Sequence, residues 1–123
     1  MSYLTPRKRA RALGASGGGT EHHWYTVVTS SALLLLIPLF VFTFGTVLGR
    51  PYEEVLVALA NPFRALVIGL TLVVGLVHFR NGVQVVLEDY AHGAPRKAMV
   101  VAAVCVTYAL LAAGLFAVAR LAL

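Results

Sequence analysis

The chain has 123 residues, of which 59% are hydrophobic and 12% are charged, with a formal net charge of +5. Soluble domains contain roughly 45–50% apolar and about 25% charged residues, and a small domain has too little interior to hide such an excess of apolar surface. The composition therefore excludes an ordinary water-soluble domain. The single cysteine, Cys105, excludes an internal disulfide and a cysteine-based metal site.

The N-terminal residues 1–20 are polar and end in the glycine-rich stretch GASGGGT. We predict that they form a flexible cytoplasmic leader ahead of a membrane domain spanning residues 21–123. Most of the net positive charge comes from this leader, through Arg7, Lys8, Arg9 and Arg11. We interpret these residues as a membrane-topology signal that also favours anionic lipid, and we expect no nucleic-acid partner.

Three long apolar stretches follow, at about residues 24–48, 63–90 and 98–121. Each reaches the roughly 20 residues that a helix needs to cross a hydrocarbon core of about 30 Å. Lipid offers the backbone no hydrogen bonds, so these stretches are expected to span as helices. The predicted fold is an all-α integral membrane protein with three transmembrane helices.

Several local features refine these spans. Trp24 and Tyr25 suit the interfacial aromatic belt, and Pro38 predicts a kink in the first span. The polar cluster at residues 29–31, Thr-Ser-Ser, is expected to pack against a neighbouring helix. Between the first two spans, VLVALA (55–60) is expected to lie along the outer surface, and the turn at residues 91–97 ends the second helix.

Orientation follows from the lysines and arginines outside the membrane. Arg96 and Lys97, between the second and third spans, lie on the same side as the basic leader. Fewer basic residues lie on the other side, namely Arg50, Arg64 and Arg120. The positive-inside rule then places the N-terminus in the cytoplasm and the C-terminus in the periplasm of a bacterial inner membrane.

The second span carries His78 near its middle, and ionisable groups at that depth are costly and usually functional. On a helical wheel, Gly75, Gly82 and Asp89 fall on the same stripe as His78. Three partners could satisfy the imidazole: a carbonyl or hydroxyl of another helix, a metal such as haem iron, or a proton relay. The glycines could open space for a flat macrocycle or allow close helix packing.

Asp89 and Tyr90 end the second span where water, lipid and protein meet. A tyrosine hydroxyl can donate a hydrogen bond to a carbonyl oxygen, and a carboxylate can relay protons. An interfacial aromatic beside a solvated acid is the alternative. On the opposite side of the helix, Arg80, Gln84 and Glu88 could form an i, i+4 ladder, or Arg80 could pair with a partner subunit.

The pattern H-x3-G-x6-D-Y (His78, Gly82, Asp89, Tyr90), in the second of three spans, resembles the smaller hydrophobic membrane-anchor subunits of bacterial succinate dehydrogenases. The leader GTEHHWY and the chain length extend the likeness over nearly the whole chain.

This resemblance implies a haem b shared with a second, cytochrome b anchor subunit, with His78 as one axial ligand to the iron and Gly82 packing against the haem. It implies ubiquinone as substrate, with Tyr90 binding a quinone carbonyl and Asp89 supporting it and supplying protons. It also implies an iron–sulfur subunit and a flavoprotein subunit, so the chain alone is expected to have no activity.

One departure concerns the haem propionates. Many relatives carry an arginine at the start of the first span, whereas this chain reads YTVVTSSA at residues 25–32. Another subunit, Arg80 or the pair His22 and His23 could supply the charge instead. Two rival functions remain at this point: a haem-free structural anchor of a respiratory or fumarate reductase complex, and a small membrane transporter.

Overall fold

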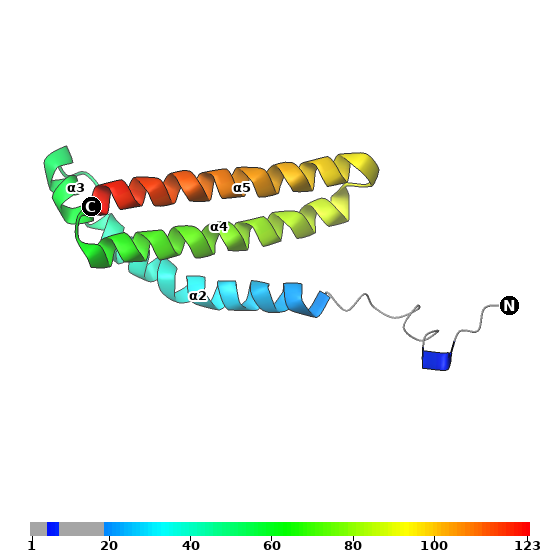
Figure 1. Cartoon of the computed structure of the whole chain (residues 1–123). Coiled ribbons are helices and arrows are strands. Elements are labelled where there is room, and N and C mark those ends of the chain that lie inside the picture. The colour runs from blue at the N-terminus through cyan, green and yellow to red at the C-terminus, as the bar shows by residue number, and fades with distance from the viewer. Residues whose placement is uncertain (1–4, 8–18) are drawn as a thin grey trace.

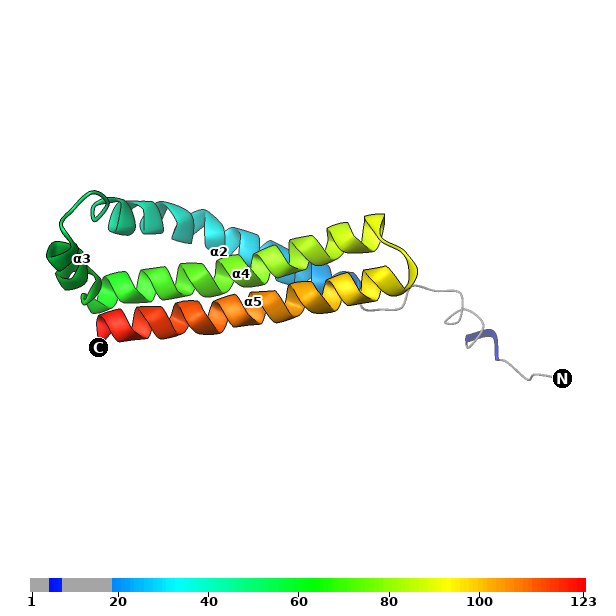
Figure 2. The ribbon, with the colours of Figure 1, turned by 90° about the horizontal axis from the view of Figure 1, so that it is seen from above.

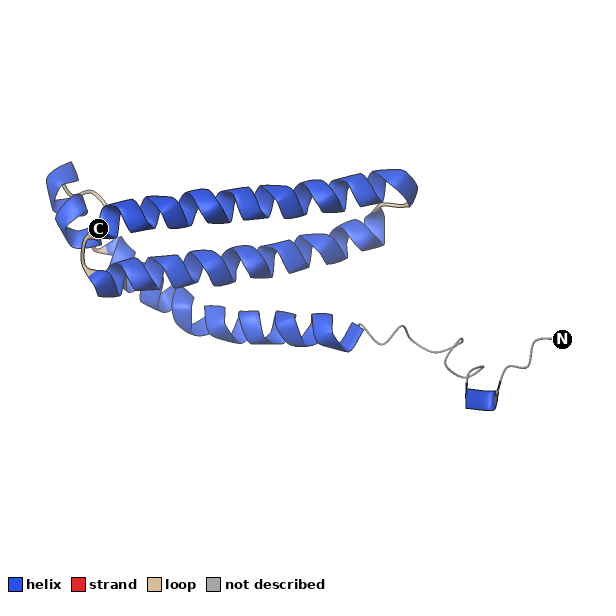
Figure 3. Cartoon of the chain, viewed as in Figure 1, coloured by secondary structure: helices blue, strands red, loops and turns tan. Residues whose placement is uncertain are grey.

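A computed structural model describes residues 5–7 and 19–123, and the part of the chain from residue 19 onward is built of helices joined by short turns (Figure 3). The helices are α2 (Gly19–Gly45), α3 (Tyr52–Leu59), α4 (Pro62–Tyr90) and α5 (Gly93–Ala122). Among the described residues, α2, α4 and α5 are long and apolar enough to cross a membrane. The predicted all-α fold with three candidate spans is confirmed. The leader predicted at residues 1–20 lies mostly outside the described residues.

Helix α4 is the centre of the arrangement, because it packs against both α2 and α5 (Figures 1 and 2). Successive long helices run in opposite directions. The start of α2, the end of α4 and the start of α5 therefore share one end of the bundle, and α3 and the C-terminus lie at the other. We call the first of these the Tyr90 end.

The start of α4 is fixed by local chemistry. The Asn61 side chain accepts hydrogen bonds from the backbone N–H groups of Phe63 (3.0 Å) and Arg64 (3.4 Å). Asparagine is among the best N-cap residues, and Pro62 follows at the first helical position, where a missing N–H costs nothing. The observed start agrees with the predicted one to within a residue.

The turn between α4 and α5 is shorter than predicted. Helix α5 already begins at Gly93, whose φ of +71° suits glycine, and Pro95 lies in its first turn. Proline is tolerated there for the same reason as at the start of α4. Gly93 and Pro95 therefore lie at the start of α5. The predicted turn at residues 91–97 contracts to Ala91 and His92.

Helix α2 is displaced toward the N-terminus relative to the predicted span. It begins at Gly19, with Glu21 in its first turn, where a carboxylate is favoured by the helix dipole. It ends at Gly45, and the chain turns through Gly49 at φ +78°. Figure 1 shows α2 changing direction in its cyan part, the region that contains Pro38, as predicted for an internal proline.

Helices α4 and α5 approach each other closely at Gly114. A Cβ built on this glycine would collide with the Leu72 side chain, whereas one on Gly69 would meet Leu115 at an ordinary 3.9 Å. Within the described chain the buried hydrophobic side chains are Val47 and Val67, and many large apolar side chains are exposed. Lipid or a protein partner must cover that surface, as expected for a membrane protein.

Candidate functional site

His78 lies in the middle of α4, on the side that faces α2. Its imidazole is half-buried, and its Nδ1 lies 3.0 Å from the hydroxyl oxygen of Thr29. The first of the three predicted kinds of partner, a hydroxyl of another helix, thus exists for one ring nitrogen. The predicted packing of the polar cluster at residues 29–31 against a neighbouring helix is also seen, through Thr29. Sequence reasoning did not pair these two residues, because nothing in the sequence sets the register between the helices.

Two open hollows meet at the His78 side chain. The first runs along α4 toward the Tyr90 end and is lined, besides His78, by mostly apolar side chains and one glycine: Phe79, Gly82, Val83, Val86 and Leu87. The second lies against α2 and is lined by side chains from its central part: Ser30, Leu33, Leu34, Ile37 and Pro38. His78 therefore stands at the centre of an apolar surface that this chain leaves uncovered.

Gly82 and Gly75 leave open space beside His78. A Cβ built on either glycine would have no atom of the described chain within 4 Å, apart from its immediate helical surroundings. Neither glycine therefore brings two helices of this chain together. The sequence left two roles open for these glycines, close helix packing and space for a flat macrocycle. The structure favours space for a group outside the chain.

Tyr90 and Asp89 lie at the last turn of α4 and are both exposed, Tyr90 by 84%. Phe79, Gly82 and Val86 are exposed as well, and together with Tyr90 they follow the i, i+3, i+7, i+11 spacing of one helix face. An uncovered stripe thus runs from beside His78 to Tyr90. At 1.5 Å per residue, these two residues lie about 18 Å apart along the helix axis.

Arg80 points away from this stripe toward α5. Its guanidinium carbon lies 5.7 Å from the ring centre of Tyr108, and its Nη1 donates to the Tyr108 hydroxyl at 3.4 Å. Its Nε is buried and makes no hydrogen bond within the described chain. The i, i+4 ladder, one of the alternatives that the sequence left open for Arg80, is therefore broken at its first step. Cation–π contact with Tyr108 takes its place.

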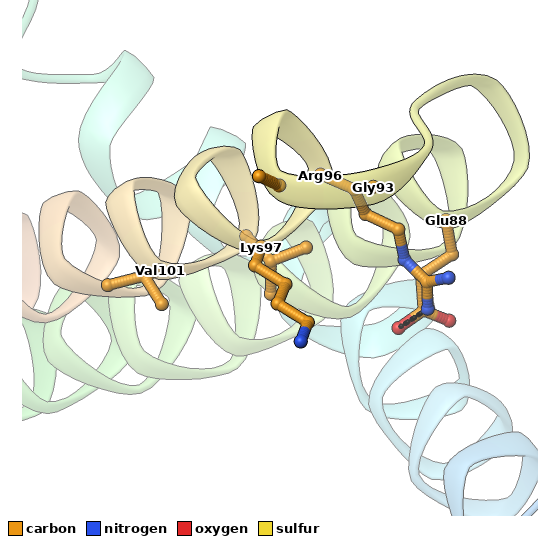
Figure 4. Close-up of a pocket in the computed structure, with 7 residues that line it drawn as sticks. Glu88, Gly93, Arg96, Lys97 and Val101 are labelled. Atoms are coloured by element: carbon orange, nitrogen blue, oxygen red, sulfur yellow. Dashed lines mark ion pairs between the residues drawn. The ribbon is translucent and has the colours of Figure 1, made fainter.

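The rest of the ladder forms and continues into α5. Gln84 Nε2 donates to Glu88 Oε1 at 3.0 Å, and Arg96 Nη2 lies 3.7 Å from the same carboxylate oxygen. This group borders a hollow between the end of α4 and the start of α5, which Gly93, Lys97 and Val101 also line (Figure 4). Both charges of the ion pair are about half exposed, so we expect it to contribute little to stability.

The chain was compared with known proteins. Residues 1–114 match the family model of the succinate dehydrogenase/fumarate reductase transmembrane subunit. The chain is 40% identical over 123 residues to the succinate dehydrogenase hydrophobic membrane anchor subunit of Paracoccus denitrificans, with all of this chain and 95% of the relative covered. No solved structure gives a significant match.

Proposed function

We propose that this chain, a membrane-anchor subunit of succinate dehydrogenase, holds half of a haem b site and part of a ubiquinone site. The chain belongs to the succinate dehydrogenase/fumarate reductase transmembrane-subunit family. His78 is the axial ligand in this proposal, Gly82 packs against the haem, and Tyr90 and Asp89 bind the quinone. The family membership makes the chain one component of a larger complex and confirms the resemblance seen in the sequence.

The observation that carries the haem proposal is the uncovered apolar surface around His78. A half-buried imidazole opens onto two hollows lined mainly by hydrocarbon, and Gly82 leaves room beside it. A flat macrocycle with an apolar body requires these features, and in this proposal the second anchor subunit supplies the other imidazole. When bound, haem supplies one-electron redox chemistry. The residues of this chain orient it and exclude water.

The quinone proposal rests on the exposed end of α4. The Tyr90 phenol is free to donate a hydrogen bond to a quinone carbonyl oxygen, and the neighbouring Asp89 carboxylate can pass protons from the water at this end. Reduction of a quinone to a quinol takes two protons. Because both side chains are exposed at the end of a helix, other subunits complete the site.

The partners and location follow from the same proposal. The second anchor subunit covers the stripe from His78 to Tyr90, and the iron–sulfur subunit, which receives electrons from the flavoprotein subunit, binds at the Tyr90 end. The complex lies in a bacterial inner membrane. The chain contributes binding surface and proton supply, and it has no succinate oxidation activity by itself.

The test is the optical spectrum of the assembled complex with His78→Ala. We expect loss of the dithionite-reduced b-type band, while dye reduction by the soluble subunits continues, because the substitution removes only the ligand. His92→Ala is the matched control: this histidine is exposed at the start of α5 and should leave the band intact. A band that survives His78→Ala contradicts the ligand assignment, and an unmodified complex without the band is a haem-free anchor.

A further inference from the structure

The contact between His78 and Thr29 joins α4 to α2 at the candidate ligand. Thr29 is half-buried, and its hydroxyl oxygen lies 3.0 Å from His78 Nδ1. The same oxygen lies 2.8 Å from the carbonyl oxygen of Tyr25 and 3.1 Å from that of Thr26, within its own helix. Three polar atoms therefore surround one hydroxyl group.

We assign the direction of these hydrogen bonds by counting the protons that each group carries. A hydroxyl carries one proton, and a backbone carbonyl oxygen can only accept. The Thr29 hydroxyl makes its shortest contact with the Tyr25 carbonyl, at 2.8 Å, so we assign its proton to that hydrogen bond. A hydrogen bond between Thr29 and His78 then requires that the imidazole donate, with its proton on Nδ1. The other ring nitrogen, Nε2, is left without a proton and with a free lone pair.

We infer that Thr29 is a positioning residue that selects the tautomer of His78 and fixes the plane of its ring, so that Nε2 is ready to bind a metal. This inference rests on the proposed role of His78 as an axial ligand. A histidine that ligates a metal through one nitrogen typically donates from the other, and this bond orients the ring and raises its basicity.

The consequence for a bound haem can be stated as a direction. An imidazole that donates from Nδ1 is a stronger electron donor through Nε2, and it stabilises ferric iron relative to ferrous iron. Loss of the Thr29 hydroxyl should therefore raise the midpoint potential of the haem. It should also weaken haem binding by about 10- to 100-fold, the usual cost of removing such an outer partner.

The experiment compares three variants in the assembled complex. Thr29→Val keeps the shape and removes the hydroxyl, and Thr29→Ser keeps the hydroxyl and removes the methyl group. Thr26→Val is the control, because the Thr26 hydroxyl lies one turn earlier on α2 and donates to the His22 carbonyl at 3.0 Å. The measurements are the haem midpoint potential by redox titration, the electron paramagnetic resonance of the ferric haem, and the haem content per complex.

We expect Thr29→Val to raise the potential, change the ferric signal and lower haem retention, while Thr29→Ser and Thr26→Val resemble the unmodified complex. The inference is overturned if Thr29→Val retains haem with an unchanged potential and signal. If the Thr29→Val complex loses haem altogether, the Thr29→Ser complex decides. Haem retention in Thr29→Ser supports the role of the hydroxyl, and haem loss overturns the inference. Failure of the haem proposal itself looks different, because the b-type band would then be missing from the unmodified complex or would survive His78→Ala.

Discussion

At the scale of single residues, the two proposed sites differ in how much of each this chain supplies. His78 has a hydroxyl partner within the chain and an apolar surface around it. Tyr90 is 84% exposed at the end of a helix and is not among the residues that line the hollows described above. The haem half-site is thus largely preformed, whereas the quinone site depends on surfaces from other subunits.

The role of Tyr90 can be tested by Tyr90→Phe, which removes only the hydroxyl. We expect a fall in quinone reduction, while artificial-dye reduction by the soluble subunits stays nearly unchanged. Loss of one hydrogen bond worth about 1 kcal/mol corresponds to a decrease of about fivefold in quinone reduction. A loss of about a hundredfold or more would mean that the phenol also delivers a proton. The measurement is steady-state reduction of a water-soluble ubiquinone analogue.

Tyr52→Phe provides the control for that experiment. Tyr52 is also largely exposed, at 70%, but it lies in α3 at the opposite end of the bundle. Both activities should stay at the unmodified level in this variant. If Tyr90→Phe reduces quinone as fast as Tyr52→Phe does, Tyr90 is only an interfacial aromatic residue.

How far the site could be predicted depended on what each residue requires. A histidine at mid-membrane depth is costly enough to be noticed from hydropathy alone, so His78 was identified without a structure. The pairing of His78 with Thr29 was not identified, because a threonine can bond its own helix backbone and needs no tertiary contact. For Arg80 the sequence left open a bond along its own helix and a pairing outside the chain, and the register between α4 and α5 instead places Tyr108 within its reach.

At the scale of helices, long apolar stretches predicted α2, α4 and α5 because span length is set by the bilayer. The ends were less predictable. Asn61 and Pro62 carry a strong start signal, and the start of α4 was correct to within a residue. At the turn before α5, Gly93 and Pro95 are compatible with either an ending or a beginning helix, and hydropathy could not choose between them.

Close packing of α4 and α5 predicts opposite effects for two glycine substitutions. Alanine is favoured over glycine in a helix interior by roughly 0.5–1 kcal/mol. Gly69→Ala should gain this stability, because the new Cβ meets Leu115 at an ordinary contact distance of 3.9 Å. Gly114→Ala should be destabilising, because the new Cβ forces the Leu72 side chain to move, and overpacking typically costs about 1–3 kcal/mol.

The measurement is the thermal stability of the purified complex, followed for each variant by retention of this subunit. Leu72→Ala supplies a double-mutant cycle: combined with Gly114→Ala, it should destabilise less than the two single changes added together. Strict additivity, or a Gly114→Ala complex more stable than the unmodified one, would show that the helices separate easily at this point.

At the scale of the whole molecule, the exposed apolar surface has two parts with different requirements. The outer surface of the three long helices needs only lipid. The stripe from His78 to Tyr90 combines the open position at Gly82 with polar groups at mid-depth and at the end of α4. Lipid chains offer such groups no hydrogen bonds or metal, so this face is the one expected to require a second protein.

The direction of the bundle in the membrane is the last consequence of its construction. The start of α2 and the start of α5, which carries Arg96 and Lys97, lie at one end, and the C-terminus lies at the other (Figure 1). Positive residues remain in the cytoplasm, so the Tyr90 end should face the cytoplasm.

Alkaline phosphatase fused after Leu123, with the other subunits co-expressed, should therefore be active in the periplasm, and the same enzyme fused to the N-terminus should be inactive. The reverse pattern would place Asp89 and Tyr90 at the periplasmic face, remote from any cytoplasmic iron–sulfur subunit, and the quinone proposal would fail together with the orientation.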